Sequence, residues 1–181
     1  LMQRVIVSSD HQEIIRISKE FGAEVPFVRP AELSEDVPSE LVTQHAVKFL
    51  ENETEKAIDI AVTLQPTTPF CTSEDIDACI QLLLDHPDLE TALTTKKVHD
   101  RPEWMFSVDG YKAHLLMDGE CSGERGVSQS LPDLCIPNGA VFATRREVLF
   151  RKNLIVSNTT GIHIMSPEKS IDIDVPIDFK M

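Results

Sequence analysis

The first part of the chain switches between two hydrophobic periods. Residues 4–9 (RVIVSS) form an apolar run that is typical of a buried β-strand. A helical pattern follows, in which Asp10 and Glu13 have capping-box spacing and Gly22 suits the left-handed position after a helix. Its apolar face consists of Ile14, Ile15 and Ile17. A second short strand is expected at residues 25–28.

The alternation continues up to residue 95. Ser39 can cap a helix, which precedes a strand at residues 58–64. Thr72 and Asp75 form another capping-box pattern, ahead of a helix and a strand at residues 91–95. Apolar positions on these two helices are Val42, Ala46, Phe49 and Leu50, then Ile76, Ile80, Leu83 and Leu84. Strands alternating with amphipathic helices predict an α/β fold with a mainly parallel sheet covered by helices.

The second part of the chain is less regular. A polar stretch at residues 118–130 precedes a strand-like run at 140–144. We interpret residues 99–134 as an excursion within a single domain that spans residues 1–181. Its apolar side chains would form an exposed patch on an isolated chain, so we predict that the excursion forms a homodimer contact. These side chains are Trp104, Met105, Phe106, Leu115, Leu116 and Met117.

The two ends of the chain suggest an interior fragment. A strand as apolar as residues 4–9 is usually buried on both faces, so we expect another element upstream of it. Residues 176–181 are typical of the first turn of a helix.

Composition narrows the class of protein. The chain has 181 residues, 41% of them hydrophobic, and no apolar run near the roughly 20 residues that cross a bilayer. A cytoplasmic protein is expected. The four cysteines form no CxxC pair, which argues against zinc and a disulfide framework. The formal charge of -13 disfavours nucleic acid and anionic membranes as partners, and any phosphate ligand must be held by local cations or a metal.

One acidic motif can bind a metal. In the sequence IDIDV at residues 171–175, an extended chain places Asp172 and Asp174 on one face, about 7 Å apart. Mg²⁺ commonly takes one or two carboxylates together with substrate phosphates. The alternative is a solvated edge strand, because any half-buried strand alternates apolar and polar residues.

Two polar loops are further candidates. Gln65 lies in LQPTTP (residues 64–69), where a strand gives way to a helix, and ligands bind beyond such strand ends. Asn138 lies in PNGA (residues 137–140), where Gly139 permits close backbone approach. Each motif alone is also compatible with an ordinary turn.

Taken together and in order, these motifs resemble the acylneuraminate cytidylyltransferase family along almost the whole chain. The matching stretches are RVIVSSD, FGAEVPFVRPAEL, LQPTTP, PNGAVF and IMSPEKSIDIDVPIDF. The resemblance implies a Rossmann-like, three-layer nucleotidyltransferase fold and a homodimer. It also implies a Mg²⁺-dependent enzyme that joins CMP from CTP to a nine-carbon 2-keto sugar acid and releases pyrophosphate.

The resemblance assigns roles to individual residues. It implies that Asp172 and Asp174 are the catalytic metal-binding pair, that Gln65 and Asn138 contact the sugar or line the active site, and that Arg29 contacts the cytidine.

Three departures from the family pattern leave a second interpretation open. The first strand and the basic, glycine-containing nucleotide loop of the family are missing. Val127 stands where the family has an arginine, a role that Arg125 could take over, and Phe142 replaces a common tyrosine. The alternative is therefore a noncatalytic relative that acts as a dimeric binding or regulatory module.

Overall fold

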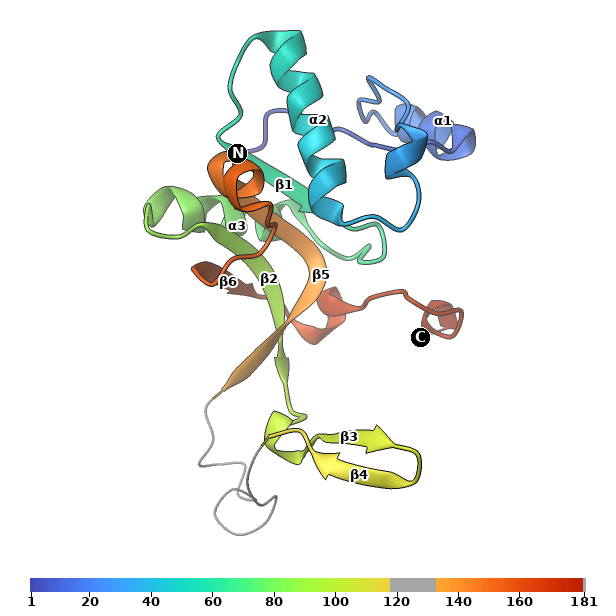
Figure 1. Cartoon of the computed structure of the whole chain (residues 1–181). Helices are drawn as coiled ribbons and strands as arrows, with labels where there is room; N and C mark the ends of the chain where they lie inside the picture. The colour runs from blue at the N-terminus through green and yellow to red at the C-terminus, as the bar shows by residue number, and fades with distance from the viewer. Residues whose placement is uncertain (118–132, 181) are drawn as a thin grey trace.

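The computed structural model describes residues 1–117 and 133–180. Four strands form its central sheet in the order β1 (Ile60–Leu64), β5 (Leu134–Arg145), β2 (Thr91–Val98) and β6 (Thr160–Ile164) (Figure 1). The expected strands at residues 58–64, 91–95 and 140–144 are all present, and the last two extend further than their apolar runs.

The sheet is mixed, which corrects the expectation of a mainly parallel one. Strand β2 pairs in parallel with β6, whereas β5 is antiparallel to both β1 and β2. Strands β1, β2 and β6 therefore share one direction, and β5 is inserted against them. The reversal arises because β5 follows the excursion, which returns the chain to the sheet from the far end of β2 (Figure 1). The predicted α/β class is confirmed.

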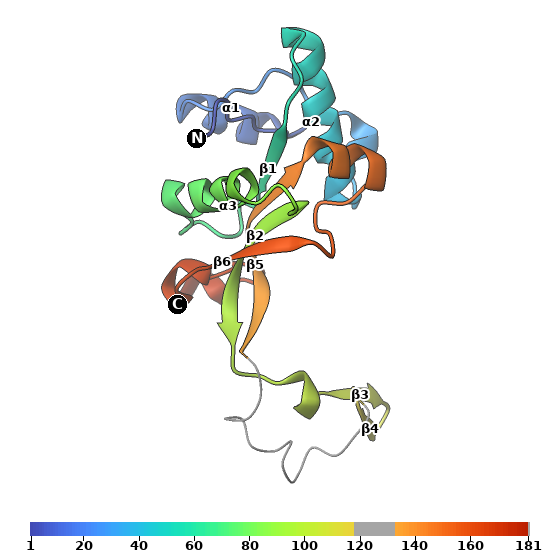
Figure 2. The ribbon, with the colours of Figure 1, turned by 90° about the vertical axis from the view of Figure 1, so that its left-hand side faces the viewer.

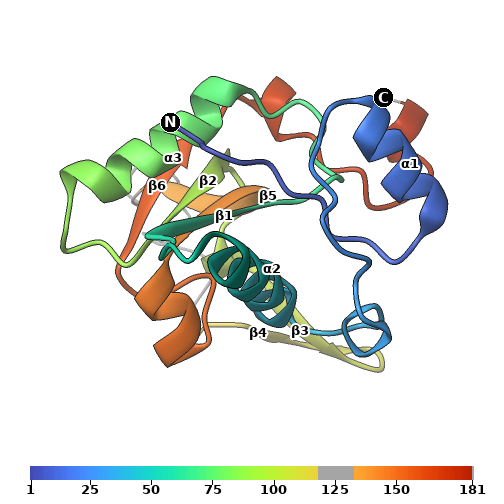
Figure 3. The same cartoon turned by 90° about the horizontal axis from the view of Figure 1, so that it is seen from above.

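Helices cover both faces of the sheet (Figure 3). Helix α3 (Ser73–Asp85) packs on one face, and α2 (Ser39–Thr54) lies on the other with the short helix Val148–Lys152. Each face has its own core, centred on the fully buried Leu83 and Leu149 respectively. Burying one such leucine adds roughly 2 kcal/mol to the free energy of unfolding. Because the two clusters lie on opposite faces, each helix layer is held to the sheet by its own core. The Thr72–Asp75 capping box that starts α3 is confirmed.

The N-terminal region contains less regular structure than the sequence predicts. Helix α1 spans Gln12–Glu20, and Gly22 adopts a φ of 85° just after it, as expected. Asp10 makes no cap, because the helix begins later, after His11. The strands expected at residues 4–9 and 25–28 are wrong: only an isolated parallel bridge joins Ile6 to Glu24.

The excursion forms a hairpin that stands away from the sheet (Figure 2). Strand β3 (Phe106–Asp109) pairs with β4 (Lys112–Leu115), and short 3-10 helices lie at Ala31–Leu33, Pro102–Trp104, Pro167–Ser170 and Asp178–Lys180. The last of these lies within residues 176–181, where the sequence suggests the first turn of a helix. Within the described residues, no helix is long and apolar enough to cross a membrane.

Candidate active site

Three motifs from distant parts of the sequence meet at Gly139. This glycine has a φ of +80°, and a Cβ atom added to it would lie 2.8 Å from Gln65 Oε1 and 3.4 Å from Asp172 Oδ2. Gln65 and Asp172 therefore both lie against the backbone of β5. A side chain at position 139 would be strained by its φ and would displace the glutamine, so the geometry requires glycine.

The segment that carries Asp172 is held by side chains and single backbone bonds. Residues 171–175 do not form the strand that the IDIDV pattern predicts. The Ile173 N–H donates to the carbonyl of Thr67 at 2.8 Å, and the N–H groups of Asp174 and Val175 both donate to Asp178 Oδ2 at 2.9 Å. These bonds take the backbone groups that a sheet ladder would need, so the chain stays irregular.

Asp172 has a buried oxygen without a partner. Its Oδ1 atom is inaccessible to solvent and accepts no hydrogen bond, while Asp174 is exposed. Both aspartates and Ser170 line a cleft of about 470 Å³, together with Lys96 and Lys97 from β2. A buried carboxylate oxygen without a donor is costly unless a cation or ligand group completes it.

Asn138 lies next to this cleft, and both the oxygen and the nitrogen of its side-chain amide make hydrogen bonds. Its Oδ1 accepts from the Thr94 hydroxyl at 2.7 Å and from the Ala140 N–H at 3.3 Å. Its Nδ2 donates to Met165 Sδ at 3.1 Å and to Ser170 Oγ at 3.0 Å. The Asn138 side chain is almost completely buried. It therefore joins β2 and β5 to the segment that leads into Asp172.

Arg29 and Gln65 line a second, smaller cavity of about 200 Å³ between α2 and the end of β1. The guanidinium of Arg29 donates to the hydroxyl of Ser8 at 3.1 Å and also to the Ser8 carbonyl. Gln65 therefore lines this smaller cavity and also lies against Gly139, next to Asp172 of the larger cleft.

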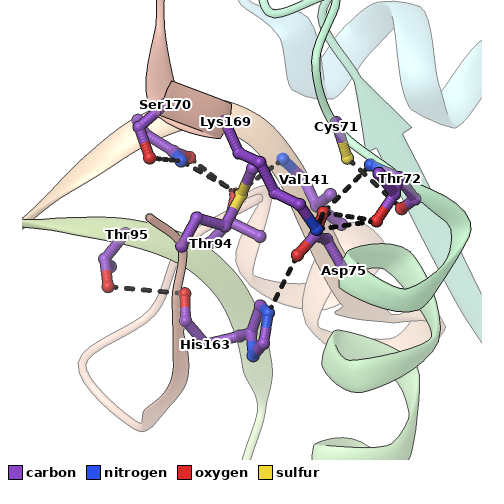
Figure 4. A network of polar contacts seen from close by, with 11 residues as sticks. Cys71, Thr72, Asp75, Thr94, Thr95, Val141, His163, Lys169 and Ser170 are labelled. Atoms are coloured by element: carbon purple, nitrogen blue, oxygen red, sulfur yellow. Dashed lines mark hydrogen bonds and ion pairs between the residues drawn. The ribbon is translucent and has the colours of Figure 1, made fainter. Parts of the chain in front are cut away.

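A polar network beside the cleft links α3 to the end of β6 (Figure 4). Asp75 is nearly buried and receives hydrogen bonds from the Thr72 backbone and hydroxyl, at 2.9 and 2.7 Å, and from Lys169 Nζ at 3.0 Å. His163 Nε2 lies 3.1 Å from its other oxygen. Burial opposes ionisation of Asp75, but the Thr72, Lys169 and His163 contacts outweigh it and hold the pKa of this carboxyl well below its usual range.

Comparison with known proteins identifies the family. The family model described as "Cytidylyltransferase" matches residues 1–112. The chain belongs to the cytidylyltransferase family. The CMP-N,N'-diacetyllegionaminic acid synthase of Legionella pneumophila is 25% identical over 99% of this chain and 76% of its own length. The N-acylneuraminate cytidylyltransferase of Escherichia coli is 24% identical over 100% of this chain and 41% of its own length.

One solved structure has a similar fold to this cytidylyltransferase. It is the CMP:2-keto-3-deoxy-manno-octonic acid synthetase complexed with CTP, with a TM-score of 0.61 at 18% identity. The alignment covers 99% of this chain and 78% of the other. At this identity the likeness supports the fold alone.

The remaining candidate residues of the cytidylyltransferase lie apart from the cleft or outside the described residues. Phe142 packs in the α2-side core, where it is paired across the sheet with Thr63 and Leu93. Arg125 and Val127 belong to residues 118–132, which lie outside the described residues.

Sequence reasoning missed the second role of Asp75 and the presence of lysines in the cleft. Asp75 was visible only as a helix cap, because its contacts with His163 and Lys169 cross about 90 residues of sequence. Lys96 and Lys97 carried no local signal, since lysines are common wherever the end of a strand reaches solvent.

Proposed function

We propose that the chain catalyses transfer of CMP from CTP to a nonulosonic sugar acid, with release of pyrophosphate. The family and the two curated relatives support the reaction class. The observation that carries the proposal to particular residues is the unpartnered, buried Oδ1 of Asp172, a residue that lines the larger cleft and packs with its Oδ2 against Gly139.

Asp172 and Asp174 fit a magnesium site. The donor set is two carboxylates on one cleft, and one of their oxygens lacks any hydrogen-bond donor. When bound, Mg²⁺ would neutralise charge on the phosphates and on the leaving pyrophosphate. The protein itself would hold the sugar so that its anomeric hydroxyl can attack the α-phosphorus, and positioning would dominate the rate enhancement.

Local cations must offset the acidity of the chain. A formal charge of -13 and two aspartates on the cleft would repel both CTP and a sugar carboxylate. Lys96 and Lys97 face this cleft, and within residues 1–117 and 133–180 Lys96 makes no ion pair. We assign to Lys96 the neutralisation of anionic substrate groups that enter there.

The smaller cavity suits the nucleotide base. Arg29 and Gln65 line it beside α2, and the hydrogen bonds that the Arg29 guanidinium donates to Ser8 fix it in place. A cytosine needs both donors and acceptors at its edge, which the amide of Gln65 can supply. The sugar acid would then lie on the Asp172 side of Gln65.

Two copies of the chain would form a homodimer through the β3–β4 hairpin. Its apolar side chains are exposed, including Val108 at 75% and Phe106 at 50%. An apolar patch of this kind on a hairpin that stands away from the sheet is suited to a homodimer contact. A cytoplasmic location, where CTP is synthesised, accords with this function.

Pyrophosphate release by the purified protein tests the proposal. We expect release that requires CTP, Mg²⁺ and a sugar acid together, and that Asp172→Asn abolishes. Lys96→Met should raise the KM for an anionic substrate, whereas Lys56→Met, an exposed lysine on the linker before β1, should not. Binding of CTP without any acid-dependent turnover would instead favour the noncatalytic module.

A further inference from the structure

The irregular segment that carries Asp172 depends on contacts outside any sheet ladder. The chain enters it through the 3-10 helix Pro167–Ser170 and leaves it at Asp178. Three attachments surround Asp172: Lys169 on Asp75, Ser170 on Asn138, and the Ile173 N–H on the Thr67 carbonyl. Two of these three are side-chain contacts, so the position of the carboxylate is set by particular residues.

The Lys169 attachment is the strongest of the three in electrostatic terms. Its ammonium lies 3.0 Å from Asp75 Oδ2 and 3.0 Å from Thr72 Oγ1. Asp75 is 5% exposed and Lys169 39%, so solvent screens this pair less than an open surface pair. Figure 4 shows the lysine reaching from the 3-10 helix to the first turn of α3, with His163 on the opposite side of the carboxylate.

We propose that Lys169 is a positioning residue, which holds Asp172 at the cleft by anchoring residues 167–172 to Asp75 at the start of α3. The inference rests on the proposed function, because it assigns to Asp172 the metal and substrate phosphates of that reaction. Asp75 acts through Lys169, and neither residue touches the substrate. A metal-binding side chain on an anchored segment loses little conformational freedom when the metal binds, whereas one on an unanchored segment must first be ordered.

The test separates positioning from general stability. The probe is Mn²⁺ with α,β-methylene-CTP, and free Mn²⁺ is followed by electron paramagnetic resonance in the purified protein. Lys169→Met should raise the Mn²⁺ dissociation constant by about tenfold, as loss of an outer-shell partner of a metal ligand typically does. Lys169→Arg should restore most of the affinity, because it keeps the charge on Asp75.

Lys152→Met is the matched control. It breaks the Lys152–Glu90 ion pair, whose side chains are 51% and 27% exposed, at the far end of β2 from the cleft. It should leave Mn²⁺ affinity unchanged whatever it does to the thermal midpoint. A Lys169→Gln variant, which also removes the charge but keeps a polar side chain with an N–H donor, serves if Lys169→Met does not fold.

The outcomes distinguish the two proposals. If the wild type turns over substrate and both Lys169→Met and Lys169→Gln bind Mn²⁺ with unchanged affinity, the positioning role is overturned and the proposed function stands. Absence of acid-dependent turnover in the wild type would remove both. Weakened Mn²⁺ binding in the Lys169 variants, with a wild-type value in Lys152→Met, is the result that the structure predicts.

Discussion

Replacing Asp172 with alanine should make the protein more stable and less active at once. In the structure, Oδ1 of this residue is buried without a hydrogen-bond donor. An unsatisfied buried polar atom costs about 1–3 kcal/mol, and we take the lower end because the rest of the side chain is partly exposed. Removing it should raise the free energy of unfolding by about 1 kcal/mol, which corresponds to roughly 2–4 °C in Tm.

Activity should move in the opposite direction. Loss of one of two metal-binding carboxylates should lower kcat by roughly a thousandfold, about 4 kcal/mol of transition-state stabilisation. Asp174→Ala is the matched comparison, because Asp174 is exposed. It should lower activity without raising Tm.

The assay combines thermal unfolding in EDTA with pyrophosphate release in Mg²⁺. Addition of Mg²⁺ and CTP should raise the Tm of the wild type and leave that of Asp172→Ala nearly unchanged, since a ligand stabilises only a form that binds it. A lower Tm for Asp172→Ala in EDTA, together with retained turnover, would show that Asp172 stabilises the fold and holds no catalytic metal.

Three further predictions concern other parts of the molecule. Gly139→Ala should lower the free energy of unfolding by about 1–3 kcal/mol, because its φ of +80° disfavours alanine and its Cβ would lie 2.8 Å from Gln65 Oε1; chemical denaturation measures this. The pKa of Asp75 is lower in the folded protein than in the unfolded chain, where it is near 4. The ionised carboxylate therefore adds to the free energy of unfolding above about pH 4, and this contribution is lost as the pH falls through the pKa of the folded state. Acid unfolding of Asp75→Asn should lack this loss of stability. Val108→Asp should convert a dimer to monomer in light scattering, since this side chain is 75% exposed on the hairpin; an unchanged dimer mass would place the contact elsewhere.

Local sequence signals predicted local structure well. The Thr72–Asp75 capping box is confirmed because both partners lie within one turn. Gly22 follows α1 with positive φ for the same reason: the conformation depends on one residue.

Features that depend on distant partners were harder to predict. The apolar run at residues 4–9 has strand composition, yet a strand needs neighbours, and only the Ile6–Glu24 bridge supplies one within the described residues. The IDIDV pattern alternates as a strand does, but Thr67 and Asp178 take its backbone N–H groups. No local pattern reveals such competition.

The candidate site was accessible from sequence only through the order of its motifs. Gln65 and Asp172 are more than 100 residues apart, and each alone fits an ordinary turn or edge. Their contact with Gly139 follows from the insertion of β5 beside β1, which hydrophobic periodicity does not encode. The anchoring of Lys169 on Asp75 is of the same kind.

The most direct test of the central claim is ³¹P NMR of the purified protein with CTP, Mg²⁺ and an N-acylneuraminate or legionaminic acid. We expect the three CTP signals to be replaced by pyrophosphate and one phosphodiester signal in equal molar amounts, only when the sugar acid is present. Consumption of CTP at the same rate without the acid, or no phosphodiester signal with it, would show that the chain does not transfer CMP to the sugar acid.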